Sequence, residues 1–188
     1  MKKMILSLAA AGILGTAGAA MVELNGTFEK CTATPQGVVM PEGWDVNKGV
    51  SKGAEVRATR DEDGKRNGFF GVKVDVEKDG SAYMHKWQSI NVKKGDVVTI
   101  KVWVKGKGKV ACGFYCNNEK GAFLCTIASP MKDVDSEEWV EYEAVHTIDG
   151  VNNDKIVPSS IIPVIYVGGD SRVALDDYSF DLASSSAQ

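Results

Sequence analysis

Residues 97–106 alternate apolar and polar side chains with a period of two. One parity holds Val98, Ile100, Val102 and Val104. The other parity holds Thr99, Lys101, Trp103 and Lys105. A period of two is the side-chain repeat of a β-strand, so this run predicts a strand with one buried and one exposed face. Trp103 is unexpected on the polar face, because large aromatic side chains are usually buried, and it is our first candidate for a binding residue.

Further short strands follow the same pattern, and turn-forming residues separate them at close spacing. We predict strands over residues 70–77, 83–92, 97–105, 109–116, 122–127, 139–147, 161–167 and 172–182. Residues 51–60 are polar and weakly patterned. No stretch of the sequence has a convincing helical period, and no repeat or change of composition divides it. The sequence therefore predicts an all-β sandwich or barrel formed by one domain over residues 20–182, with a disordered tail over 183–188.

Residues 1–19 have the form of a secretory signal peptide, with Lys2 and Lys3, an apolar stretch from Met4 to Leu14 and a small-residue end. The apolar stretch is too short and too rich in Gly and Ala for a spanning helix, so we predict cleavage and no membrane span. We expect a secreted, periplasmic or cell-surface protein. Without Lys2 and Lys3, the 22 basic residues fall to 20 against 25 acidic ones, which argues against nucleic acid as a partner.

The predicted mature chain contains four cysteines, and an even number in an exported protein indicates disulfides. They are Cys31, Cys112, Cys116 and Cys125. On one strand, Cys112 and Cys116 would have Cα atoms about 13 Å apart, which is too far for a bridge. Two pairings remain: Cys116–Cys125 with Cys31–Cys112, or Cys112–Cys125 with Cys31–Cys116. We favour the first, because residues 117–124 form a loop that the bridge would close. Free thiols, and a zinc site that adds His146, are the alternatives.

Five segments occur in a familiar order: Asn25–Glu29, Pro41–Trp44, Gln88–Gly106, Trp139–Tyr142 and Ala174–Phe180. Together they resemble the galactose-binding-like jelly rolls of carbohydrate-binding module families four, nine, sixteen and twenty-two. The resemblance covers nearly all of residues 20–182 and implies a two-sheet antiparallel β-sandwich. Trp44 and Trp139 occupy landmark positions of this fold, so we expect both in the core.

The resemblance also implies a structural calcium where the two chain ends meet. The matching positions are Glu29 and Asp176, whose carboxylates are the hard oxygen ligands that calcium takes. Asp177 would replace Asp176 if the last strand carries a bulge. The alternative is that these acids are ordinary surface charges.

A glycan-binding groove, on one sheet face or in edge loops, is a further implication. Pyranose rings stack their C–H faces on aromatic planes, and our candidates are Trp103, Trp87 and Tyr115. Trp87 and Trp103 become cross-strand neighbours if Ile90 lies opposite Ile100; otherwise Trp87 belongs to the core. The lysines at positions 101, 105, 107 and 109 weakly indicate an anionic glycan.

Catalysis is not expected. Only His85 and His146 are available as histidine bases, and the sequence has no nucleophile elbow, phosphate loop or His-Glu-x-x-His motif. We therefore predict a secreted, non-catalytic carbohydrate-binding protein with a polysaccharide or glycan as partner. The alternative is a jelly-roll ectodomain for protein interaction or envelope structure. An exposed groove at Trp103 would favour the first, and a loop covering Trp103 would favour the second.

Overall fold

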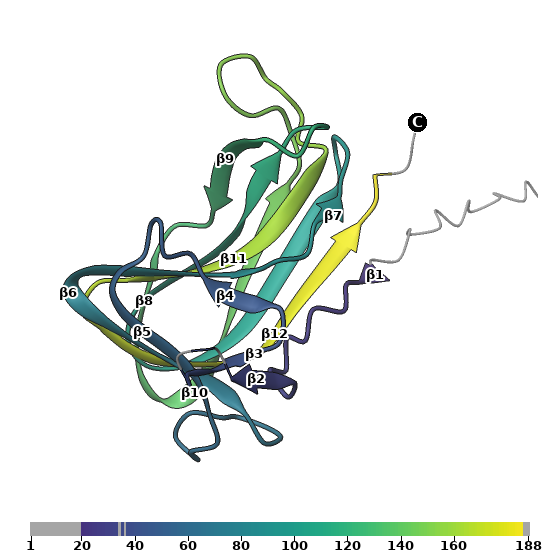
Figure 1. Ribbon diagram of the computed structural model, residues 1–188. Helices are drawn as coiled ribbons and strands as arrows, with labels where there is room; N and C mark the ends of the chain where they lie inside the picture. The colour runs from purple at the N-terminus through teal and green to yellow at the C-terminus, as the bar shows by residue number, and fades with distance from the viewer. Residues whose placement is uncertain (1–19, 34, 36, 186–188) are drawn as a thin grey trace, which may run out of the picture.

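The computed structural model describes residues 20–33, 35 and 37–185, so the predicted signal peptide and residues 186–188 lie outside the described part. Every regular element of the described residues is a β-strand, and all strand pairings are antiparallel (Figure 1). The predicted all-β fold class is therefore confirmed. No helix in this part of the chain is long and apolar enough to cross a membrane.

The strands follow the order β1 to β12 along the chain. Their bounds are β1 Ala20–Met21, β2 Cys31–Ala33, β3 Val39–Pro41, β4 Trp44–Val46, β5 Lys52–Thr59, β6 Gly71–Lys86, β7 Ile90–Asn91, β8 Val97–Asn117, β9 Phe123–Ala128, β10 Lys132–Thr147, β11 Ser160–Gly168 and β12 Ser171–Ala183. β2 and β3 form a small separate sheet, and the other ten strands are joined by hydrogen bonds.

The ten strands form two layers because β6 and β8 are long enough to contribute to both. The β11 layer contains β4, residues 81–86 of β6, β7, β11, residues 110–117 of β8, and β9. The β10 layer contains β5, residues 71–76 of β6, β12, residues 97–107 of β8, and β10. The described chain ends lie side by side, since β1 pairs with the end of β12 (Figure 1).

The core lies between the layers and is built from the inward parity of each strand. Val98, Ile100, Val102 and Val104 are all buried, which confirms the inward face predicted for residues 97–106. Burying each such side chain stabilises the fold by about 1.5–3 kcal/mol. Trp44 is buried as predicted and donates its indole N–H to the Leu24 carbonyl. Trp139, also predicted for the core, is only half-buried, because it lies at a register shift in β10.

Several predicted strand ends were wrong. The turn predicted at Gly106 is a bend inside β8, and the turn predicted at residues 78–80 lies inside β6. β5 was not predicted, because its sequence is polar and weakly patterned; in the structure Val56, Ala58 and Thr59 are buried. Residues 183–185, predicted to be disordered, are ordered: Ala183 pairs in β12, and the Ser185 N–H donates to Asp96.

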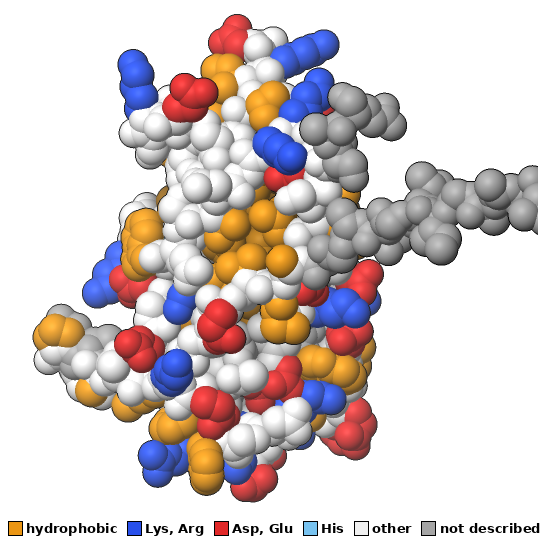
Figure 2. Space-filling view, turned by 90° about the vertical axis from the view of Figure 1, so that its right-hand side faces the viewer, with side chains coloured by type: hydrophobic (Ala, Val, Ile, Leu, Met, Phe, Trp, Pro, Cys, Tyr) orange, Lys and Arg blue, Asp and Glu red, His pale blue; other side chains and the backbone are white. Residues whose placement is uncertain are grey.

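The surface carries charges of both signs. Figure 2, which views the right-hand side of Figure 1, shows hydrophobic side chains gathered in the middle of this face, with Lys, Arg, Asp and Glu intermixed around them. No single sign of charge dominates this face, in agreement with the near-balanced composition.

Candidate functional site

The outward face of the β11 layer carries most of the aromatic side chains outside the core. In β6, Ala82 and Met84 point inward, so Tyr83 and His85 point outward, and Trp87 follows the strand end. The same alternation turns Tyr115 of β8 and Tyr166 of β11 to this side. We call this surface the aromatic face; its aromatic members are Tyr83, Trp87, Tyr115, Phe123 and Tyr166.

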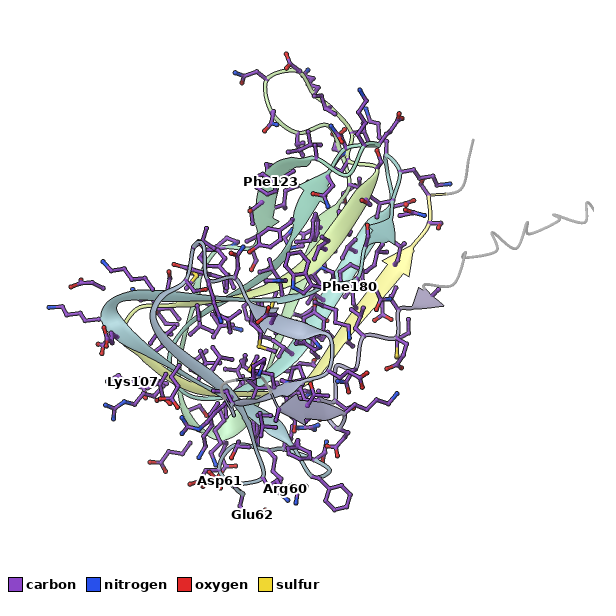
Figure 3. All side chains as sticks on the ribbon, viewed as in Figure 1. Arg60, Asp61, Glu62, Lys107, Phe123 and Phe180 are labelled. Carbon is purple, nitrogen blue, oxygen red and sulfur yellow. The ribbon has the colours of Figure 1, made fainter. Side chains whose placement is uncertain are left out.

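Two groups of rings occupy the aromatic face. Tyr83 and Tyr166 are cross-strand partners, with ring centroids 4.5 Å apart. The second group is a series of ring contacts. The His85 ring centroid lies 4.0 Å from that of Trp87 and 6.0 Å from that of Tyr115. Tyr115 lies 6.0 Å from Phe123 of β9, which Figure 3 labels at the top of the view. These separations suit edge-to-face or tilted aromatic packing.

A cavity of about 260 Å³ lies at the Tyr83–Tyr166 end. It is lined by Tyr83, Ala111, Gly113, Thr126, Ala128, Ser129, Met131, Val164 and Tyr166. Small residues form part of this lining where β8 and β9 meet, and a Cβ at Gly113 would lie 1.9 Å from the Ile127 carbonyl oxygen. None of the lining side chains is charged, so the cavity offers apolar and neutral polar contacts.

Exposure differs strongly among these rings. The Trp87 and Phe123 side chains are 63% and 62% exposed, so their faces are open to a ligand. Tyr115 is nearly buried, and its hydroxyl accepts a hydrogen bond from the Asn47 amide at 3.2 Å. The aromatic face therefore combines open rings with rings held in place by neighbours.

His85 is the polar side chain beneath this group of rings. It is 1% exposed, and neither ring nitrogen has a hydrogen-bond partner. Burial lowers the pKa of His85, although the nearby Asp45 carboxylate acts in the opposite direction. The imidazole is therefore neutral at pH 7.

Trp103 lies elsewhere, on the outward face of the β10 layer between Glu141 of β10 and Asp176 of β12. The Arg66 guanidinium stacks 3.8 Å from the ring centroid and is ion-paired with Asp177. One indole face is thus covered by the loop between β5 and β6, which at this residue favours the alternative of an ectodomain for protein interaction or envelope structure over a sugar platform.

The structure does not bring Trp87 and Trp103 together. Ile90 pairs with Ile161 of β11, whereas Ile100 pairs with Ala144 and Phe180. The cross-strand arrangement of the two tryptophans is therefore absent, and Trp87 is exposed rather than part of the core. Of the three predicted sugar-stacking residues, Trp87 and Tyr115 share the aromatic face and Trp103 does not.

The two predicted calcium ligands both hold the loop between β5 and β6. Glu29 accepts backbone N–H groups of Phe69 and Phe70 at 3.0–3.2 Å. Asp176 accepts the N–H groups of Arg66 at 2.7 Å and Asn67 at 3.1 Å, and burial raises its pKa. A bulge follows Asp176.

The carboxylate oxygens of these acids fit a calcium site poorly. The oxygens of Glu29 and Asp176 are already used by backbone N–H groups, and Asp177 accepts from the Arg66 and Asn67 side chains. Within the described ranges, no three or more His, Cys, Asp or Glu side chains group in a way that could hold a metal ion. The acids anchor a loop, and calcium remains a prediction without support from this geometry.

The remaining sequence candidates lie away from the aromatic face. Lys101 is paired with Glu141 and Glu143 on the β10 layer. None of the lysines of β8 lines the cavity at the Tyr83–Tyr166 end. The four cysteines are free thiols in this structure, so neither of the two predicted disulfide pairings is present. His146 lies 3.3 Å from the Cys112 carbonyl and packs edge-to-face against Phe114, and burial lowers its pKa.

Sequence reasoning missed Tyr83, Tyr166 and Phe123 as site residues. For Tyr83 and Tyr166 a signal existed, because each has the outward parity of its predicted strand. Phe123 had no such signal in the sequence, because its side chain is turned toward this face by a register shift between Cys116 and Asn117.

Comparison with known proteins gives likeness at the level of fold. No protein-family model matches this sequence, and no curated protein matches it significantly. Among solved structures, the CBM22-1 xylan-binding domain from Paenibacillus barcinonensis Xyn10C has a TM-score of 0.53 at 16% identity, covering 86% of this chain and 94% of that one. A cyclase from Fischerella sp. TAU has a TM-score of 0.62 at 12% identity, covering 90% and 100%.

A third similar structure is the enzymatically active domain of bacteriophage CBA120 tailspike protein 4, with a TM-score of 0.56 at 12% identity. The match covers 84% of this chain but only 21% of that one. Binding modules and enzymatic domains thus both occur among the similar structures, so this likeness concerns architecture alone. The chain has the galactose-binding-like jelly-roll fold that its sequence resembled.

Proposed function

We propose that this protein binds a polysaccharide or glycan on the aromatic face, without catalysing its cleavage. The observation that carries the proposal is the grouping of five aromatic side chains on one sheet face, where Tyr83 and Tyr166 line a cavity with no charged side chain. Sugar rings stack on such surfaces through their C–H faces, and tyrosine and tryptophan add polar handles. Likeness to the xylan-binding domain supports the same role.

The size of the face fits a chain of sugars rather than one ring. Along β6, Tyr83 and Trp87 are separated by four residues, or about 13 Å of strand. The Tyr83–Tyr166 pair and the exposed Trp87 would therefore contact different parts of one glycan. The neutral lining favours an uncharged glycan over the anionic one that the lysines of β8 had indicated.

The proposal includes export and the absence of catalysis. The predicted signal peptide supports a secreted, periplasmic or cell-surface location, where polysaccharides are available. On the aromatic face, neither ring nitrogen of the buried, neutral His85 makes a hydrogen bond to an acid or a nucleophile, although the Asp45 carboxylate lies nearby. A glycan incubated with the protein is expected to be recovered uncleaved.

The test is a glycan array with the purified protein and with Trp87→Ala and Tyr166→Ala variants. Loss of one stacking ring should weaken binding about tenfold, since 1.4 kcal/mol corresponds to one decade. The control is Phe69→Ala, because Phe69 is 73% exposed but lies in the loop between β5 and β6. Its removal should leave binding unchanged.

Melting temperatures of all variants separate local loss of binding from unfolding. Binding that survives both aromatic-face variants would contradict the proposed site. A folded protein that binds no neutral or acidic glycan would favour the alternative of an ectodomain for protein interaction or envelope structure.

A further inference from the structure

Cys116 of β8 and Cys125 of β9 lie directly opposite each other in an antiparallel pair. Opposite residues point to the same side of a sheet, and here that side is the core: Cys116 is buried and Cys125 is half-buried. Their Cα atoms are expected about 4.5–5.5 Å apart, within the range that disulfides span. The register therefore places the two thiols within reach of each other.

The other cysteines are not placed for pairing. Cys31 lies in β2 opposite Pro41, and its thiol donates to the Phe28 carbonyl at 3.0 Å. Cys112 lies opposite Ile165 of β11 and is four residues along β8 from the position opposite Cys125. That offset is about 13 Å, which excludes a Cys112–Cys125 bridge in this register.

We propose that Cys116 and Cys125 form a cross-strand disulfide when the protein meets an oxidised low-molecular-weight disulfide such as oxidised glutathione. The Cys125 thiolate attacks the glutathione disulfide and releases one glutathione. The Cys116 thiolate then attacks the mixed disulfide and releases the second. Two cysteine thiols are oxidised, one external disulfide is reduced, and the two protons pass to the released glutathione thiolates.

The surroundings of the pair set the order of these steps. Burial and the adjacent Cys125 raise the pKa of Cys116 to about 12, so its thiolate is scarce while the protein is folded. Cys125 is the more accessible thiol and makes the first attack. Oxidation of the folded protein is therefore slow, and oxidation during refolding is faster.

The bond would fasten an edge strand. Among the described strands β9 pairs with β8 alone, and the Asn152 side-chain amide donates one further hydrogen bond to the Leu124 carbonyl at 3.4 Å. β9 also carries Phe123 and Thr126 toward the aromatic face. A disulfide at Cys125 would reduce local opening of residues 117–128. Its effect on glycan affinity rests on the proposed function; the disulfide itself does not.

The experiment compares the reduced protein with protein refolded in oxidised glutathione. Thiols counted after denaturation should fall from four to two, and peptide mapping should link Cys116 to Cys125. The melting temperature should rise by about 5 °C, as expected for a short closed loop in a protein of this size. Hydrogen exchange across residues 117–128 should slow.

Two variants make the test specific. Cys31→Ser removes a thiol outside the pair and should keep the Cys116–Cys125 link, with thiols falling from three to one. Cys125→Ser, at the half-buried position, should lose both the link and the rise in melting temperature.

Four thiols after oxidative refolding, or a link that involves Cys31 or Cys112, would overturn the proposal. A linked protein that binds no glycan would contradict the proposed function and leave the disulfide standing.

Discussion

Trp103 shows how one neighbour changes the role of a side chain. Its parity in β8 is outward, as predicted, yet Arg66 from a loop 37 positions earlier lies over the ring. A stacked guanidinium at a partly exposed site contributes about 0.5–2 kcal/mol. The indole therefore helps to hold the loop between β5 and β6.

For Trp103→Ala we expect a lower melting temperature, by about 2–6 °C, with glycan affinity unchanged. Arg66→Ala should give a similar loss, because it removes the same stack together with the Asp177 ion pair. Thermal melts and glycan titrations of both variants provide the measurement. If Trp103→Ala kept its stability and lost glycan binding, the site would have to move to the β10 layer.

Asp176 anchors the same loop through its buried carboxylate. Asp176→Ala would leave the Arg66, Asn67 and Asp177 N–H groups without this acceptor, at a cost of about 3 kcal/mol. Chemical denaturation measures the loss, and Asp135→Ala, an exposed residue of β10, is the control.

Metal removal gives a second test at the same residue. Because backbone N–H groups already occupy the carboxylates, we expect EDTA to leave the melting temperature of the unaltered protein unchanged. A fall with EDTA that added calcium reverses, and that Asp176→Ala abolishes, would instead establish the calcium implied by the family resemblance.

At the scale of elements, β8 depends on the bend that carries it from one layer to the other. Gly106 has a φ of 115°, and a Cβ there would lie 2.3 Å from the Arg172 carbonyl oxygen of β12. Both the backbone conformation and the close strand approach therefore require glycine.

Gly106→Ala should cost about 3 kcal/mol or more in unfolding free energy. Gly121 is a matched control, since its φ of 75° is also positive but no atom lies within 4 Å of an added Cβ. Gly121→Ala should cost only about 1 kcal/mol, the effect of strain alone. Equal losses in denaturant titrations would show that the clash with Arg172 is relieved by a backbone shift.

For the whole molecule, the two histidines make stability depend on pH. Burial lowers the pKa of both His85 and His146 below the ordinary value of 6.5, so the unfolded chain binds more protons in this range. Stability is then fully present above pH 6.5 and is lost as pH falls toward the folded-state pKa values.

Unfolding free energy measured by denaturant titration should therefore fall between pH 7.5 and pH 5.5. His85→Gln and His146→Gln should each flatten the slope, and the double variant most of all. A slope that stays the same in the double variant would assign the effect to acidic groups.

The sequence was informative wherever a property depends on near neighbours along the chain. Val98, Ile100, Val102 and Val104 face the core because a strand alternates its sides whatever it pairs with. The same local rule identified Tyr115 as outward. Trp44 belongs to one of the five segments that carry the jelly-roll resemblance, and it is buried.

The alternation of side chains along a strand could not predict which distant segments pair. Alternation gives each strand two sides, but it does not say which strands are adjacent or what covers the outer side. Arg66 reaches Trp103, and β11 joins Tyr166 to Tyr83, only because strands far apart in sequence pair in space. The sequence by itself determined most of the strands without their exact ends, the inward sides of those strands and the jelly-roll class. The tertiary structure alone decided which aromatic residues share an open face, because contacts between layers depend on register and connection rather than on local order.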